Sequence, residues 1–213
     1  AVGHDALQAN TTGTENTAVG SAALDANTTG QQNVGCGKSV LSANTTGSAN
    51  TACGVQALEN NTTANNNTTF GAFAGQANTT GTNNCAFGRS SLVLNTTGGG
   101  QTAYGMQSMH SATTGTNNTG IGVNALYDLT TGSNNLGLGV SAGRSSSPSG
   151  TITTGSNQIC IGNNSHTDAF IKIALTVTSD ERDKTDIQDI TTGLDFVNQL
   201  KPKSFWFKKD RDT

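Results

Sequence analysis

Residues 17–33 read TAVGSAALDANTTGQQN, and residues 34–50 read VGCGKSVLSANTTGSAN. Both stretches have a glycine at the fourth position, a leucine at the eighth and an Asn-Thr-Thr-Gly sequence after that. The first of these glycines recurs every 17 residues from Gly3 to Gly139, and the Thr-Thr pairs recur at the same interval. A fixed period of this kind indicates a repeat architecture, in which each unit stacks on the next.

Two apolar columns run through the repeats. The first consists of the residue before the recurring glycine and the residue two positions earlier, such as Cys36 and Val34, which alternation places on one face of a short strand. The second is a leucine or methionine four residues after the glycine: Leu7, Leu24, Leu41, Leu58, Leu92, Met109 and Leu126. We therefore expect two short strand-like segments in each coil, each with apolar residues on one side.

The fold class that these columns predict is all-β. We expect a parallel β-solenoid, or β-roll, of 17-residue coils whose equivalent residues form ladders at the strand spacing of ~4.8 Å. Helix is disfavoured because the repeat is dense in Asn, Thr and Gly. In the Thr-Thr-Gly turn, we expect glycine to supply the positive φ of a tight corner.

One coil contains little apolar volume, so a free-standing chain would have a thin core. Three chains side by side could bury the leucine column, including Leu24, Leu41, Leu58 and Leu92, at a shared axis. The sequence therefore favours a homotrimeric fibre in which the chain's main partner is itself.

Breaks in the period predict the domain boundaries. Residues 1–168 are expected to form the repetitive shaft, with an exposed loop at 144–152, where the interval between equivalent glycines lengthens from 17 to 23 residues. Residues 169–178 are expected to form a linking strand. The period is lost from Ala169 onward, and residues 179–213 are expected to form a small α+β segment with many charges of both signs.

Composition excludes several function classes. The chain is only 12% charged and has no basic stripe, so nucleic-acid binding is not expected. No apolar run approaches the ~18 residues of a membrane span, so membrane insertion is not expected. The histidines His4, His110 and His166 lack ligand spacing and are expected at the surface. No metal and no cofactor are predicted.

Two further residue types have competing interpretations. The four cysteines are expected to be buried free thiols acting as small hydrophobes, rather than a disulfide framework. Asn-x-Thr sequons, for example at Asn27, Asn44 and Asn78, could accept glycans in a eukaryotic secretory context. We favour an internal asparagine ladder, because the sequons arise from a repeating turn. Ice binding is disfavoured because the paired threonines are adjacent in a turn.

The repeat resembles the head repeats of trimeric autotransporter adhesins, which carry N-T-A-V-G and A-L elements, and residues 1–142 follow this pattern throughout. It is also similar to phage tail-fibre shafts. In those adhesins the repeats form a left-handed parallel β-roll with three chains to a fibre, although the adhesin repeat is usually shorter than 17 residues. The resemblance implies an extracellular fibre, with a host-surface glycan or protein receptor as a candidate second partner.

A second resemblance begins at residues 179–184, which read SDERDK, and continues through Ile187 and residues 200–207, LKPKSFWF. These residues follow the pattern S-D-x-R-x-K, Ile, a short helix and L-x-P-x-x-[FYW]-x-[FY]. The pattern is similar to the start of the C-terminal intramolecular chaperone of phage endosialidases and tail spikes, which is also found in the myelin regulatory factor. A family domain runs well past Thr213.

The chaperone resemblance implies assistance in trimerisation followed by self-cleavage immediately before the motif serine. The scissile bond would be Thr178–Ser179, with Ser179 as nucleophile, Lys184 as general base and Asp180 as a candidate supporting residue. Enzymatic activity would be at most a single-turnover autoproteolysis by this Ser-Lys dyad. The alternative is that Ser179 and Asp180 cap a turn while Arg182 and Lys184 are solvated charges.

Together these features predict the shaft of a virion tail fibre or spike that takes part in host attachment. One alternative is a trimeric autotransporter-type adhesin on a bacterial cell surface, and another is a purely structural extracellular filament. Sequence beyond the C-terminal end would distinguish them, because an adhesin should continue into coiled coil and a membrane anchor.

Overall fold

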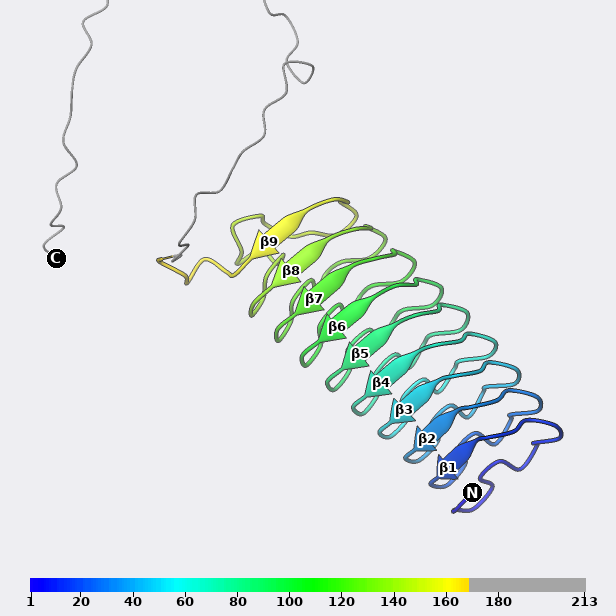
Figure 1. The fold of residues 1–213 in the computed structure, drawn as a ribbon. Coiled ribbons are helices and arrows are strands. Elements are labelled where there is room, and N and C mark those ends of the chain that lie inside the picture. Colours follow the sequence, from blue (N-terminus) through cyan, green and yellow to red (C-terminus); the bar gives the residue numbers. More distant parts are fainter. Residues whose placement is uncertain (169–213) are drawn as a thin grey trace, which may run out of the picture. The chain divides into compact units, whose positions relative to one another are not determined.

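The computed structural model describes residues 1–168 of this chain, and these residues form a β-solenoid (Figure 1). Each coil contributes one short strand to the same side of the stack. The strands are β1 (Thr17–Val19), β2 (Val34–Cys36), β3 (Thr51–Cys53), β4 (Thr68–Phe70), β5 (Cys85–Phe87), β6 (Thr102–Tyr104), β7 (Thr119–Ile121), β8 (Leu136–Leu138) and β9 (Ile159–Ile161). Within residues 1–168 there is no helix, so the all-β solenoid is confirmed. The predicted linking strand and α+β segment lie outside the described residues.

The nine strands form one parallel sheet in which each strand pairs only with its neighbours in sequence. Val19 pairs with Cys36 and Cys36 pairs with Cys53, so equivalent residues lie in register along the stack. The register is kept even across the long coil, where Leu136 pairs with Ile159. The stacking predicted from the constant period is therefore confirmed.

The leucine column lies inside each coil and forms most of the core. Leu24 and Leu41 are fully buried within the single chain, where they pack with the small central strand residues Ala18 and Ala52. The expectation that this column faces an axis shared by three chains is therefore wrong. The residue at the centre of each strand has a small side chain because the leucines fill the space beneath it. A Cβ added to Gly35 would already lie 3.4 Å from Leu24.

The second strand-like segment that we expected in each coil is also absent from residues 1–168. The leucines lie in turns, and Leu24 and Leu41 have positive φ angles of 53° and 50°. This left-handed conformation is rare for a bulky residue. It persists here because it carries a large apolar side chain into the core, where burial stabilises the coil by roughly 1.5–3 kcal/mol per side chain.

Of the two glycines that recur in the repeat, only the one that follows each strand has a positive φ. At Gly71 φ is 136°, and a Cβ would lie 2.6 Å from the carbonyl carbon of Gly88 in the next coil. The Thr-Thr-Gly glycines do not have the positive φ that we expected. At Gly30, glycine instead permits a close approach, because a Cβ would lie 2.3 Å from the carbonyl oxygen of Gly47.

The long coil makes a series of turns at the surface before it rejoins the core. Ser145, Ser146, Pro148 and Ser149 are exposed, as expected for a loop pushed out of the stack. Residue Ile152, at the end of the segment expected to be exposed, is instead buried in the core cluster. The extra residues therefore extend the coil without interrupting the apolar interior.

Candidate functional site

The predicted cleavage residues Thr178, Ser179, Asp180 and Lys184 lie outside the described residues. Their geometry is therefore not part of the structure, and their roles remain predictions. Within residues 1–168, the candidate functional groups lie in rows along the surface of the solenoid.

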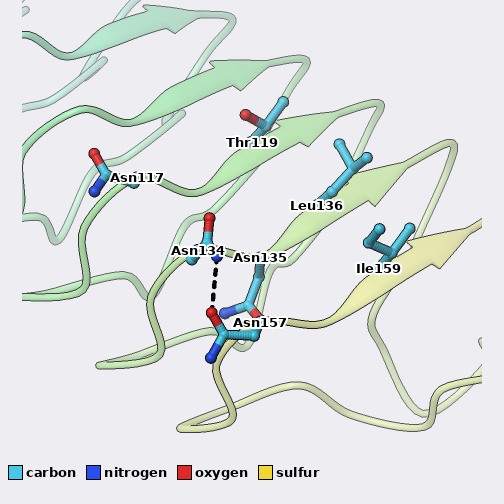
Figure 2. A pocket seen from close by; sticks show the side chains of 7 residues that line it. All are labelled: Asn117, Thr119, Asn134, Asn135, Leu136, Asn157 and Ile159. Carbon is cyan, nitrogen blue, oxygen red and sulfur yellow. Dashed lines mark hydrogen bonds between the residues drawn. The ribbon is translucent and has the colours of Figure 1, made fainter. Parts of the chain in front are cut away.

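The outward face of the sheet, called the strand face below, carries two rows of side chains. One row contains Val19, Cys36, Cys53, Phe70, Phe87, Tyr104, Ile121, Leu138 and Ile161, and the other contains Thr17, Val34, Thr51, Thr68, Cys85, Thr102, Thr119, Leu136 and Ile159. These residues are exposed or half-buried, whereas the central residue of each strand is buried. Figure 2 shows Thr119, Leu136 and Ile159 projecting from successive strands. Alternation along the chain predicted that the rows share a face, and the structure shows that this face points outward.

Exposed apolar side chains are concentrated on this side of the solenoid. Within residues 1–168, every large apolar side chain that is exposed lies on the strand face, before the first glycine at Val2, or two residues after a strand, with the single exception of Leu94. Those two residues after a strand are Val55, Met106, Val123 and Val140. The two rows of the strand face contain no charged residue.

Aromatic side chains stack along the middle of the strand face. The ring centroids of Phe70 and Phe87 are 4.9 Å apart with an interplanar angle of 14°. Those of Phe87 and Tyr104 are 5.5 Å apart at 23°. The strand spacing imposes this arrangement, and it leaves one broad aromatic surface open, with Tyr104 59% exposed.

Ladders of buried asparagine side chains join the turns of neighbouring coils. Asn44 Nδ2 donates to Asn27 Oδ1 at 2.8 Å, and Asn61 Nδ2 donates to Asn44 Oδ1 at the same distance. Asn78 continues the ladder by donating to Asn61 Oδ1 at 3.0 Å. The predicted internal ladder is confirmed, and these sequon asparagines are buried. They are therefore structural groups rather than accessible glycan acceptors.

A shallow groove borders the strand face near β9 (Figure 2). Its volume is ≈ 300 Å³, and it is lined by Asn117, Thr119, Asn134, Asn135, Leu136, Asn157 and Ile159. Within it, Asn134 Nδ2 donates to Asn157 Oδ1 at 2.7 Å. The groove thus offers amide donors and acceptors beside an apolar edge. Sequence reasoning missed it, because neighbouring coils have to stack before the asparagines meet.

The cysteines are free, as expected, but three of them are not buried. Cys36 is exposed, Cys53 and Cys85 are half-buried, and Cys160 alone is buried. Burial raises the pKa of the Cys53 thiol, and the neighbouring Cys36 raises it further. Cys53 therefore lacks the depressed pKa of an activated cysteine nucleophile.

The histidines divide between the surface and a stacked cluster. His4 and His166 are exposed, but His110 is half-buried against Tyr127, with ring centroids 4.7 Å apart. The Arg144 guanidinium covers Tyr127 at 4.6 Å from the ring centroid. Burial lowers the pKa of His110. His4 and His166 lie at the surface as expected, whereas His110 is only partly exposed and belongs to a packed ladder at the side of the coils.

Residues 1–168 contain neither a metal-binding cluster nor a membrane-spanning helix. No group of three or more His, Cys, Asp or Glu side chains in this range could hold a metal ion. The same part of the chain has no helix of the length and apolarity required to cross a membrane.

Comparison with known proteins identifies one family, at the C-terminal end. Residues 179–213 match the model of the family described as the chaperone of endosialidase. No curated protein and no solved structure matches the chain. The solenoid of residues 1–168 is thus followed closely by a segment similar to a folding chaperone.

Proposed function

We propose that residues 1–168 are the shaft of an extracellular fibre of the phage-tail type and that the residues from Ser179 onward begin a chaperone for its assembly. Three copies of the chain form the shaft, and residues 169–178 link it to the chaperone. The fibre takes part in attachment to a host-surface glycan or protein. The observation that carries this proposal is the order of the two parts: a β-solenoid directly precedes the match to the chaperone of endosialidase.

The physical character of the solenoid supports a structural role. The sheet is held by in-register pairing of successive strands, and the coil interior is held by ladders of amide hydrogen bonds. Such a stack is elongated and contacts itself only between neighbouring coils. Parallel strand pairing is slow to form, and several copies also have to associate, so a chaperone at the end of the chain can assist assembly.

The chaperone segment is proposed to cut itself from the shaft once. Ser179 Oγ attacks the carbonyl carbon of Thr178, while the Lys184 amine takes the hydroxyl proton. The Lys184 ammonium returns that proton to the Ser179 nitrogen as the amide bond breaks and an ester forms between the Thr178 carbonyl carbon and Ser179 Oγ, and water then hydrolyses the ester to a Thr178 carboxylate and the free hydroxyl. The family match begins at Ser179, which supports a boundary at this residue. Release of the chaperone would make assembly hard to reverse.

The test is expression of the complete gene as wild type, Ser179→Ala and Lys184→Ala, followed by intact-mass measurement. We expect the wild type to yield a fragment beginning at Ser179 and both variants to remain intact. Glu181→Ala is the matched control, because it removes a neighbouring charge at a position where the family pattern accepts any residue, and it should still be cut. An uncut wild type, or a fragment beginning at residue 179 in both dyad variants, would refute the catalytic assignment.

A further inference from the structure

We propose that the strand face is the surface by which copies of this chain contact one another along the fibre. The inference rests on the proposed function, which requires several copies but does not say where they touch. The strand face thus takes the place that the sequence analysis gave to the leucine column as the interface between chains, because that column is already buried within one chain.

The first argument is the extent of the apolar surface. The strand face extends from β1 to β9, a length of about 38 Å at the spacing between β-strands. Together with the residues that follow each strand, it is about 13 Å wide. This gives an area on the order of 500 Å², a size at which exposed apolar patches mark interaction sites. The two strand rows carry no charged residue, as is typical of the core of an interface, and the charged residues of the row that follows the strands, Lys38 and Arg89, are exposed at its margin.

The second argument is the repeat spacing, which identifies the occupant. Side chains on the strand face recur at every strand of a nine-stranded sheet. A partner with a different spacing would lose register after a few strands, leaving the remaining apolar side chains uncovered. A second copy has the same spacing along its whole length, including the same lengthened coil between β8 and β9. Parallel copies can therefore cover one another strand by strand.

The third argument is that the rest of the described surface has no comparable row. Apart from the strand face and the row beside it that holds Val55, Met106, Val123 and Val140, the exposed large apolar side chains of residues 1–168 are only Val2 and Leu94. The corner of each coil is instead formed by the Thr-Thr pairs, whose hydroxyls bond to the next coil, as Thr28 Oγ1 does to the Thr45 carbonyl oxygen at 3.0 Å. We therefore expect these polar corners to face solvent rather than a water-free interface.

The main experiment compares Ile121→Asp with Leu94→Asp in the product of the complete gene. The two side chains have similar exposure, 39% and 45%, but only Ile121 lies on the strand face. Mass is measured by analytical ultracentrifugation over a range of micromolar concentrations, with circular dichroism to verify that each variant is folded. We expect assembled wild type and Leu94→Asp, and at least a tenfold weaker assembly for Ile121→Asp, because a charge would be buried without a partner.

A cross-linking experiment gives an independent readout that needs no loss of assembly. In a Cys53→Ser, Cys85→Ser background, Cys36 is the remaining cysteine on the strand face. In parallel copies it meets Cys36 of the neighbouring chain, so mild oxidation should give covalent dimers. Thr46→Cys in a background that also lacks Cys36 places a thiol on an exposed corner and should give few.

The outcomes separate the inference from the proposed function. If the wild type assembles but Ile121→Asp assembles equally well, or if the corner cysteine cross-links as readily as Cys36, the inference is overturned while the fibre proposal stands. If the folded wild type is a monomer, the three-chain fibre and this inference both fail, and the strand face serves another partner.

Discussion

Single asparagine side chains couple each coil to the next. Asn61 Nδ2 donates to Asn44 Oδ1, and Asn61 Oδ1 accepts from Asn78 Nδ2. The ladder ends at Asn95, whose Oδ1 has no hydrogen-bond partner in the structure, because the equivalent residue of the next coil is Ala112. Beyond that point the column becomes apolar and joins the core. Amide pairing and apolar packing are thus alternative ways to fill the same position.

Replacing a middle member of this ladder should be costly. Asn61→Ala leaves Asn44 Oδ1 and Asn78 Nδ2 without this partner inside the coil stack. We expect a loss of about 3 kcal/mol in the free energy of unfolding, because a buried group left unpaired costs about 1–3 kcal/mol. Asn60→Ala, at the exposed neighbouring position, is the control and should change stability by less than about 0.5 kcal/mol. Urea unfolding followed by circular dichroism measures both, and equal losses would contradict the ladder's role.

The coil, as an element, depends on backbone conformations at two kinds of position. The leucine that fills the core adopts positive φ in a turn, and the glycine after each strand adopts a φ that side chains disfavour. The same glycine also allows the backbone of the next coil to approach closely. Each coil therefore combines one strained residue that buries apolar surface with one glycine that makes stacking sterically possible.

Gly71→Ala should disrupt one coil. Its φ of 136° suits glycine, and the new Cβ would lie 2.6 Å from the backbone of Gly88. Strain and overlap together should cost more than about 3 kcal/mol. Gly150→Ala is the comparison, because φ is 67° there but no atom lies within 4 Å of the added Cβ. It should cost only about 1–2 kcal/mol. Thermal unfolding distinguishes the two, and equal midpoints would show that close stacking is unimportant.

At the scale of the whole solenoid, strands contact only the strands before and after them. Stability is then close to a sum over coils and over the interfaces between neighbouring coils. The coil between β8 and β9 accommodates extra residues by turning at the surface. A coil can therefore lengthen, whereas a coil shorter than the period would lose a position in the ladders.

Deletion of one full period tests this view. Removing residues 51–67 joins Asn50 to Thr68 and preserves every row, so the chain should remain folded with a modest loss of stability. Removing residues 50–67 leaves one coil a residue short and should lower the unfolding midpoint much further, because Ala49 then takes the place of Asn50, whose Nδ2 donates to Asn33 Oδ1 of the preceding coil at 3.1 Å, and the register shifts. Thermal unfolding by circular dichroism compares the two. Equal midpoints would argue against a strict 17-residue coil.

The repeat by itself determined the class and register of the fold. With a constant interval of 17 residues, any parallel stack brings like residues together, so the ladders of Asn27 and Asn44 and the pairing of Cys36 with Cys53 could be predicted. The cleavage residues Ser179 and Lys184 were likewise identified from a local motif. They remain predictions, because they lie outside the described residues.

Only the tertiary structure decided which apolar column is buried. Alternation places two rows on one face of a strand, but it does not say which face meets the interior. The interior is too thin for large side chains from both sides, so the strand supplies small residues such as Ala18 and the turn supplies Leu24. Leu24 reaches the core through a positive φ that leucine seldom adopts and that no sequence pattern signals. The larger strand residues, such as Phe70, are consequently left on the outside of the chain.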